Sequence, residues 1–166
     1  MKEEKFHRHL GIYGVCKKGK NLLTVRKTRG PYKNRYDLPG GSIEANETLV
    51  QALHREFVEE TGMKINIISN VGTAEFIVKY DLRENTHIQH IAVFVQIDVK
   101  DEGSTRNSAS DDTSGIEWMH LDRIDEGNSS PLVMAAKEYM ITSKLEYLSR
   151  TYDAWKVKED KAWGGF

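Results

Sequence analysis

The segment Gly41–Met63, GSIEANETLVQALHREFVEETGM, places three glutamates where an ordinary helix disfavours negative charge. Glu56, Glu59 and Glu60 are spaced i, i+3 and i+4, so a helix stacks them on one face. They come just before Gly62, a residue typical of the position beyond a helix C-terminus. The helix dipole disfavours each carboxylate there by roughly 0.3–1 kcal/mol. Their grouping therefore indicates a role other than helix stability.

We predict a helix of about four turns across this segment. Asn46 suits the N-cap position, with Glu47 in the first turn. At about 100° per residue, Glu60 points between Leu49 and Leu53, toward the packed side of the helix. A carboxylate brought near a core is costly unless a cation pairs with it.

A divalent metal ion would satisfy these carboxylates, because Mg²⁺ selects hard oxygen ligands and bridges them to substrate phosphates. The alternative is a solvated acidic patch paired with Arg55 and Lys64, and the spacing alone does not separate the two. The charge distribution favours the metal site. Residues 6–36 contain no acid and nine lysines and arginines, immediately before the glutamates. Such a pair of regions suits a site that holds both a polyphosphate and its cations.

The segment matches, at every fixed position, the pattern G-x₅-E-x₇-R-E-U-x-E-E-x-G-U, in which U is a bulky apolar residue. The fixed positions are occupied by Gly41, Glu47, Arg55, Glu56, Phe57, Glu59, Glu60, Gly62 and Met63. The segment therefore resembles the Nudix box, and the chain resembles a Nudix (MutT-like) hydrolase. Leu38-Pro39-Gly40 is similar to the usual lead-in of that box.

The resemblance implies a role for each position. Glu59 and Glu60 would be metal ligands together with the backbone carbonyl of Gly40, and Mg²⁺ would be the cofactor, with Mn²⁺ as a substitute. Glu56 would be a further ligand or the general base that deprotonates the attacking water. Arg55 would orient these carboxylates. The remaining box residues would be structural, namely Gly41, Glu47 and Gly62.

Two candidates lie outside the box. Asp112 precedes Glu117-Trp118 by a few residues, as an additional metal ligand does in MutT-like proteins, although Asp111 or a solvated loop acid is equally compatible. Arg26, at the end of a predicted strand, is a candidate for phosphate binding, and an ordinary surface arginine is its alternative.

The rest of the chain predicts one α/β unit over residues 1–166, with the role of residues 150–166 open. We expect a hairpin of strands over 9–16 and 21–27, and one or two strands over 64–80 with a break near Ser69-Asn70. A central strand over 87–99, a short strand over 116–121 and a helix from Pro131 to about Leu148 follow. With the resemblance, this implies a Nudix-type α/β/α sandwich with a mixed central sheet and two long helices.

The composition narrows the setting and the partners. The single cysteine, Cys16, and an N-terminus without an apolar run predict a cytoplasmic protein, and no segment is apolar enough to span a membrane. A net charge of −1 makes a nucleic-acid partner unexpected. The sequence leaves open whether the chain forms a homodimer.

The resemblance implies cleavage of a phosphoanhydride bond in a nucleoside diphosphate linked to another group. Nucleoside triphosphates, dinucleoside polyphosphates and nucleotide sugars all stay open as substrates. Tyr80 resembles a tyrosine of dinucleoside polyphosphate hydrolases, but a core or rim tyrosine is equally compatible. The alternatives are a non-catalytic nucleotide-sensing Nudix-like domain and an isopentenyl-diphosphate isomerase, for which Cys16 is poorly placed.

Overall fold

The computed structural model describes residues 3–103 and 112–160. Their elements, in chain order, are β1 (Phe6–Lys18), β2 (Asn21–Lys27), β3 (Tyr36–Asp37), β4 (Gly40–Ser42), α1 (Leu49–Thr61), β5 (Lys64–Leu82), β6 (Asn85–Asp101), β7 (Thr113–His120), a 3₁₀ turn (Leu121–Arg123), α2 (Pro131–Thr142) and β8 (Ser149–Tyr152).

The sheet is mixed, and β1 lies at its centre. It pairs in parallel with β6 from Phe6 to Cys16, and antiparallel with β2 and β4. β5 forms a long antiparallel hairpin with β6, while β7 pairs with β2. The predicted hairpin of residues 9–16 and 21–27 and the predicted central strand over 87–99 are confirmed.

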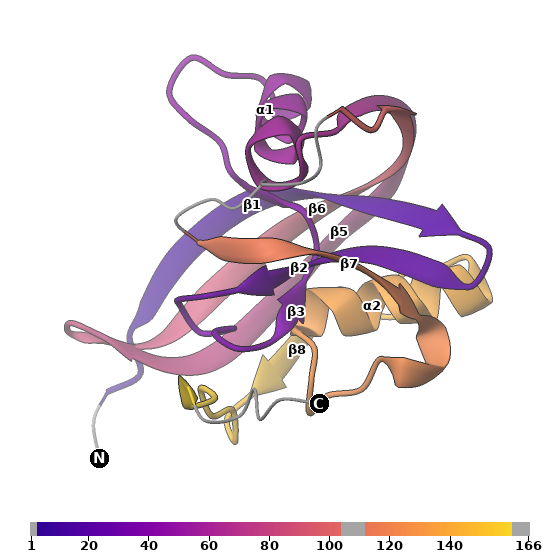
Figure 1. The fold of residues 1–166 in the computed structure, drawn as a ribbon. Helices are drawn as coiled ribbons and strands as arrows, with labels where there is room; N and C mark the ends of the chain where they lie inside the picture. The colour runs from indigo at the N-terminus through magenta and orange to yellow at the C-terminus, as the bar shows by residue number, and fades with distance from the viewer. Residues whose placement is uncertain (1–2, 104–111, 161–166) are drawn as a thin grey trace.

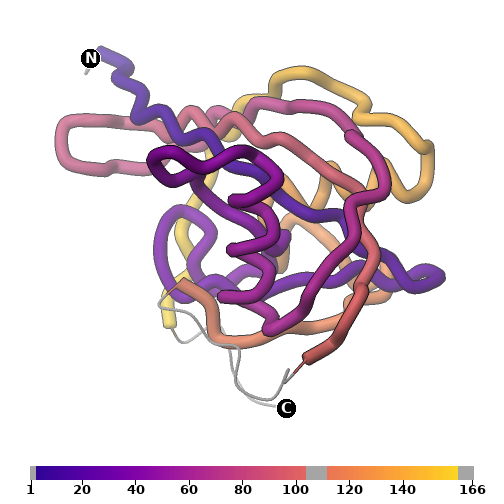
Figure 2. Tube along the Cα trace, turned by 90° about the horizontal axis from the view of Figure 1, so that it is seen from above, coloured from indigo at the N-terminus to yellow at the C-terminus, as the bar shows by residue number. Residues whose placement is uncertain are grey.

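The two helices cover opposite faces of the sheet, which confirms the predicted α/β/α sandwich (Figure 1). α1 packs with Phe57 and Leu53 into one apolar cluster, and α2 packs with Leu132 and Val133 into another. From above, α1 lies over the sheet, and the β5–β6 turn projects beyond it on the side of the N-terminus (Figure 2). Neither helix, nor any other in the part of the chain described, is long and apolar enough to span a membrane.

Helix α1 begins two residues later than predicted. Thr48, not Asn46, is its N-cap, and the Thr48 side chain and backbone exchange hydrogen bonds with Gln51. Asn46 instead has a φ of 63° within a turn in which the Glu44 amide donates to the Glu47 carboxylate. Glu47 therefore precedes the helix rather than lying in its first turn. Gly62 ends the helix in the left-handed conformation, as predicted.

Helix α2 begins at Pro131 as predicted but ends at Thr142, not near Leu148. Ser143 takes a φ of 64° and its amide donates to the Tyr139 carbonyl, which terminates the helix. The chain then returns to the sheet and forms β8 at the edge beside β5. Leu145 keeps its predicted packing role although it lies outside the helix.

The expected break near Ser69-Asn70 is present as two irregularities within one strand. β5 runs from Lys64 to Leu82, and its pairing with β6 shifts register between Ile67 and Ser69 and again between Asn70 and Gly72. Bulges of this kind bend a strand without ending it.

Candidate active site

The last turn of α1 is joined to β4 through Glu60. The backbone N–H of Gly40 donates a hydrogen bond of 3.0 Å to Oε2 of Glu60, whose exposed fraction is only 4%. Gly40 has a φ of 145°, and a Cβ on it would lie 2.1 Å from the carbonyl oxygen of Ile12. This backbone therefore requires glycine, and it brings a peptide group within reach of a buried carboxylate.

Glu56 lies one helical turn earlier and beside Gly41. A Cβ on Gly41 would lie 2.7 Å from Oε1 of Glu56, so the glycine leaves space for the carboxylate. Gly41 has ordinary negative φ, and its role is the space it leaves rather than a special backbone conformation.

Arg55 connects the carboxylates along the edge of the site. Its guanidinium donates two hydrogen bonds to Glu47, at 2.7 and 2.9 Å, and one each to Glu56 and Glu59, at 3.0 and 3.2 Å. A further bond of 3.0 Å reaches the carbonyl of Ser42. The Arg55 hydrogen bonds lower the pKa of Glu47 to about 2. Arg55 thus ties the loop before α1 to the helix.

Burial raises the pKa of the two inner carboxylates, Glu56 and Glu60, whereas the pKa of Glu47 is lowered. Loss of solvent raises the pKa of Glu60 to about 8 and also raises the pKa of Glu56, although Arg55 opposes the second shift. Two neighbouring carboxyl groups that are costly to ionise require a nearby cation if both are to be charged at neutral pH.

A polar cavity of about 120 Å³ lies against these groups. It is lined by His9, Tyr13, Lys27, Asp37, Gly40, Gly41, Ser42, Glu56, Glu60 and Asp112. Among the residues described, no three histidine, cysteine or acidic side chains are already gathered as a complete metal-binding group. The donor set nevertheless fits a hard divalent cation, since oxygen atoms of Glu56 and Glu60 border a polar space and one of them is almost fully buried.

The other predicted residues divide into those near this cavity and those apart from it. Asp112 lines the cavity and pairs with Arg29. The side chain of Glu59 is 51% exposed, bonds Arg55 and is not part of the lining. Asp111 lies outside the described residues. Arg26 is not in the lining of this cavity, and it forms an ion pair of 2.7 Å with Glu117.

Lys27, which the sequence did not single out, lines both cavities of the site. It follows Arg26 on β2 and therefore faces the other side of the strand. Lys27 lines the polar cavity, and its positive charge favours the ionised form of both Glu56 and Glu60. Lys27 is thus the basic residue that borders the two carboxylates, and phosphate binding by Arg26 stays a prediction.

A second, larger cavity of about 440 Å³ adjoins the first and shares five of its lining residues. The shared residues are His9, Tyr13, Lys27, Asp37 and Asp112; the others are His7, Arg29, Gly30, Pro31, Tyr32, Tyr80, Leu82, Ile88 and His90. Tyr80 is therefore a cavity residue. His7 and His9 are two positions apart on β1, so their side chains lie on the same face of the strand. This spacing is the sequence signal that could have indicated a shared site.

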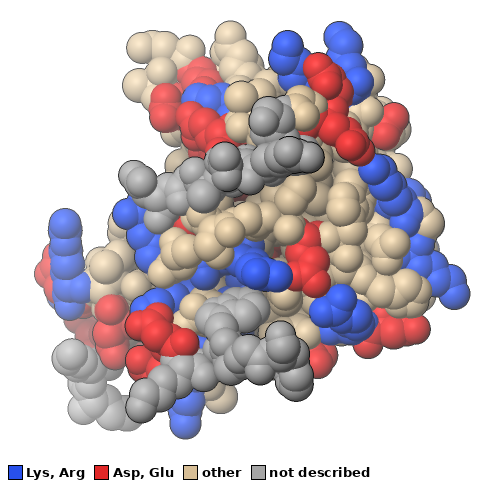
Figure 3. Space-filling view, in the orientation of Figure 1, with Lys and Arg blue, Asp and Glu red and all other residues tan. Residues whose placement is uncertain are grey.

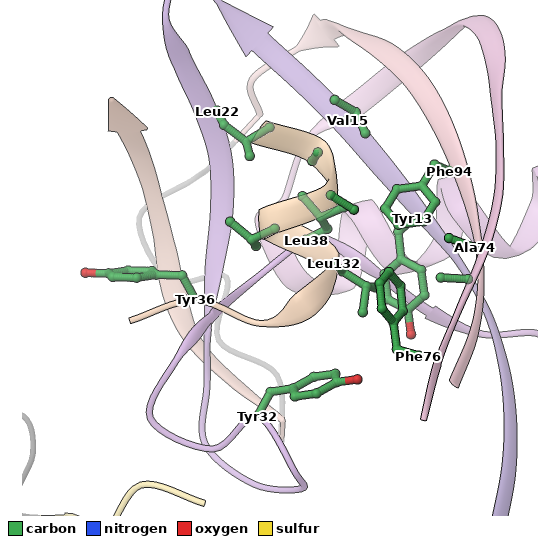
Figure 4. Close-up of a cluster of buried hydrophobic side chains, with 14 of the residues drawn as sticks. Tyr13, Val15, Leu22, Tyr32, Tyr36, Leu38, Ala74, Phe76, Phe94 and Leu132 are labelled. Carbon is green, nitrogen blue, oxygen red and sulfur yellow. The ribbon is translucent and has the colours of Figure 1, made fainter. Parts of the chain in front are cut away.

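Four side chains form a hydrogen-bonded series at the inner wall of this cavity. His90, 4% exposed, has its Nε2 2.7 Å from the Tyr13 hydroxyl and its Nδ1 2.9 Å from the Tyr32 hydroxyl. The Tyr13 hydroxyl lies 3.3 Å from Nε2 of His9. Figure 4 shows the Tyr13 and Tyr32 hydroxyls directed toward a common space, and the Tyr36 hydroxyl directed away from it.

Burial keeps this series uncharged. It lowers the pKa of His90 well below its usual value, so the ring is neutral, with one nitrogen donating and the other accepting. On the face of the molecule seen in Figure 3, basic and acidic side chains are interspersed. The inner wall formed by His9, Tyr13, Tyr32 and His90 is therefore neutral and aromatic, whereas the lining shared with the polar cavity includes the charged side chains of Lys27 and Asp112.

Comparison with known proteins agrees with this arrangement. A family model described as the NUDIX domain matches residues 5–140. An ADP-ribose pyrophosphatase of Methanocaldococcus jannaschii is 33% identical over 66 residues, which are 40% of this chain and 39% of that protein. An oxidized purine nucleoside triphosphate hydrolase of Danio rerio is 26% identical over 110 residues, which are 66% of this chain and 64% of that protein. The chain thus matches less than two thirds of the length of either relative.

A solved structure supports the fold. A NUDIX hydrolase from Nitrosomonas europaea has a TM-score of 0.67 at 20% sequence identity, over 93% of this chain and 99% of that chain. The family model itself spans most of the sequence, including both helices almost to the end of α2. On these grounds the chain belongs to the Nudix family.

Proposed function

We propose that this protein is a metal-dependent pyrophosphohydrolase that cleaves a phosphoanhydride bond in a nucleoside diphosphate linked to another group. The observation that carries the proposal is the pair of adjoining cavities with Lys27 between them. One is polar and bordered by two carboxylates with raised pKa values; the other has an aromatic wall of a size suited to a base or sugar.

In this proposal Glu60 holds the divalent ion, with the Gly40 carbonyl and Asp112 as further candidate ligands, and Glu56 accepts the proton of the attacking water. Bound Mg²⁺ or Mn²⁺ supplies positive charge that offsets the charge of the diphosphate. Lys27 binds a phosphate oxygen at the boundary of the two cavities. Glu59 lies outside the polar cavity and acts through its contact with Arg55.

Glu56 is the proposed general base, which accepts a proton from water as the water attacks phosphorus in line with the leaving group. A base is most effective when its pKa lies near the working pH, and burial shifts Glu56 in that direction. Arg55 positions Glu56 through a hydrogen bond of 3.0 Å, and Glu47 anchors Arg55.

The names of the relatives suggest the first substrates to examine, ADP-ribose and oxidised purine nucleoside triphosphates. Both contain the diphosphate and the nucleoside that the two cavities would accommodate. Dinucleoside polyphosphates and nucleotide sugars share these parts and belong in the same panel.

The test is formation of the nucleotide products over this panel, measured after their chromatographic separation, with Mg²⁺ or Mn²⁺, by the native protein and by Glu60→Gln. Glutamine retains an oxygen that can accept the Gly40 hydrogen bond, so the fold should be preserved. We expect turnover of at least one substrate, and a loss of roughly 10²-fold or more in the variant. The exposed Glu146→Gln serves as a matched control that should retain native activity. Absence of turnover across the panel, or equal turnover by Glu60→Gln, would refute the proposal.

A further inference from the structure

The segment Ser149–Asp160 lies beyond residues 5–140, the part that the family model matches. It begins with β8, which pairs in parallel with β5 from Ser149 to Tyr152. Figure 1 shows this strand at the edge of the sheet, below α2. From there the segment reaches the loop of residues 28–35, which is more than 110 positions away in the sequence.

Trp155 makes the central contacts with that loop. Its indole N–H donates a hydrogen bond of 2.8 Å to the carbonyl of Pro31. Its ring meets the ring of Tyr32 edge-on, with centroids 5.7 Å apart, and the guanidinium of Arg35 lies 4.1 Å from its centroid. One side chain therefore contacts three residues of the loop.

The backbone that follows Trp155 binds the same loop. The guanidinium of Arg35 donates to the carbonyl of Lys156 at 3.0 Å, and the amide of Asn34 donates to the carbonyl of Lys158 at 3.0 Å. Arg35 and Asn34 are both only 8% exposed. Buried donors of this kind are costly to leave without acceptors, so the contacts hold the loop firmly.

The same loop also lines the larger cavity. Gly30, Pro31 and Tyr32 belong to its lining, and the Tyr32 hydroxyl binds His90 of the inner wall. Trp155 thus contacts two residues, Pro31 and Tyr32, that also line the cavity. The position of Tyr32 depends on the C-terminal segment on one side and on His90 on the other.

We propose that the segment Tyr152–Asp160 is a specificity-determining element: Trp155 positions Tyr32 and, through it, the His90 wall of the cavity that receives the nucleoside part of the substrate. The assignment of that cavity rests on the proposed function. The positioning itself is a property of the free protein. Trp155 does not reach the cavity and is a positioning residue, not a catalytic one.

A purely stabilising role for Trp155 predicts something different. It would lower the unfolding temperature of the variant and leave the KM of the folded fraction unchanged. Positioning of Tyr32 instead predicts an altered KM with a preserved kcat, because the phosphate-cleaving residues lie in the other cavity.

The experiment compares Trp155→Ala and Trp155→Phe with the native protein, using the substrate cleaved best. Phenylalanine preserves a ring against Tyr32 and Arg35 but removes the bond to Pro31. For Trp155→Ala we expect a KM raised roughly tenfold with kcat within about twofold, and for Trp155→Phe a KM between those of the alanine variant and the native protein. Tyr139→Phe is the matched control, because it removes a hydrogen bond to Gln96 far from the loop and should leave KM unchanged.

A second readout needs no substrate. In ¹⁵N spectra of the free native protein, the two ring nitrogens of His90 should give distinct donor and acceptor signals, because each has a fixed tyrosine partner. In Trp155→Ala these signals should move toward averaged values. Should the alanine variant fail to fold, the phenylalanine variant carries the same comparison.

Unchanged His90 signals together with an unchanged KM in the folded variants would overturn the proposal. If the native protein cleaves no substrate, the proposed function fails, and the His90 spectra alone then decide whether Trp155 positions the cavity wall. The two failures are therefore distinguishable.

Discussion

The amide of Gly40 and the carboxylate of Glu60 are 3.0 Å apart, and their hydrogen bond joins strand β4 to the end of helix α1. The contact places Glu60, the most buried acid of the Nudix box, against the backbone. Neither bulk solvent nor a long cationic side chain fully compensates the charge of the carboxylate there. Two adjacent glycines lie at this point, each for a different physical reason: Gly40 for its positive φ and the close Ile12 carbonyl, and Gly41 for the space it leaves to Glu56.

Gly40→Ala and Gly41→Ala are expected to separate those reasons. At Gly40 the added Cβ meets backbone at a strained φ, so stability should fall by about 3 kcal/mol or more. At Gly41 it meets the end of a flexible carboxylate, so stability should fall by less than about 1 kcal/mol while kcat drops at least tenfold. Urea unfolding and steady-state kinetics of both variants measure this. Equal stability losses would contradict the explanation.

Glu56→Gln is expected to lower kcat by roughly 10²–10⁴-fold while Mg²⁺ affinity stays largely intact, because the amide cannot accept the proton of the attacking water. Calorimetric Mg²⁺ titration and turnover at saturating metal distinguish the two effects. If the variant loses metal binding but cleaves normally at saturating metal, Glu56 is a ligand and not the base.

Lys27→Met is expected to reduce kcat/KM at least tenfold more than Arg26→Met. Lys27 borders both cavities, whereas Arg26 faces Glu117 and the ring of Tyr36 on the other side of β2. Removal of one charge-assisted phosphate contact typically costs a factor of about 10 to 10². The adjacent positions make the pair a matched comparison. If Arg26→Met lowers kcat/KM more than Lys27→Met does, Arg26 is the residue that binds the phosphate.

Metal-free protein should become less stable as pH rises from about 5 to 8.5. Burial raises the pKa of Glu60 to about 8, from an ordinary value of 4.5, so the folded state keeps a proton that the unfolded state releases. The stability associated with this carboxyl is complete below the lower value and is lost as pH passes the higher one, by an amount on the order of 5 kcal/mol. Urea unfolding in EDTA measures the trend.

Glu60→Gln supplies the control for that measurement, because it cannot ionise. Its stability should fall less over the same pH range, and the difference between the two curves isolates Glu60. Added Mg²⁺ should restore the native protein most strongly at high pH, where the carboxylate is ionised. Parallel curves for the two proteins would show that the burial of Glu60 has no such effect.

Local patterns in the sequence predict much of the fold. Periodicity identifies the central strand and the first hairpin, and Gly62 and Pro131 correctly mark one end of each helix. The errors fall where several polar residues compete for the same structural role. Thr48 caps α1 in place of Asn46, and Ser143 ends α2 although no glycine or proline signals it.

The site is predictable only in part. The box identifies Glu56 and Glu60, which the structure places together at the polar cavity. The larger cavity is assembled from β1, β2, β5, β6 and the loop before β3, and the alignment of His9 beside His90 depends on a pairing register that no local pattern encodes. The choice between Arg26 and Lys27 depends on which face of β2 is turned inward, and a shift of one residue reverses it.

The pairing of β1 with β2, β4 and β6 has a consequence for how members of such a family can diverge. β1 positions Gly40 on one neighbour and His90 on another, so a slip or insertion within it would displace the chemical centre and the recognition surface at once. A change in the loop of residues 28–35, or in the C-terminal segment that contacts it, would not displace both regions in this way. Changes there can alter ligand preference while the residues that cleave the bond stay unchanged, which makes the segment Ser149–Asp160 a natural place for new selectivity to arise.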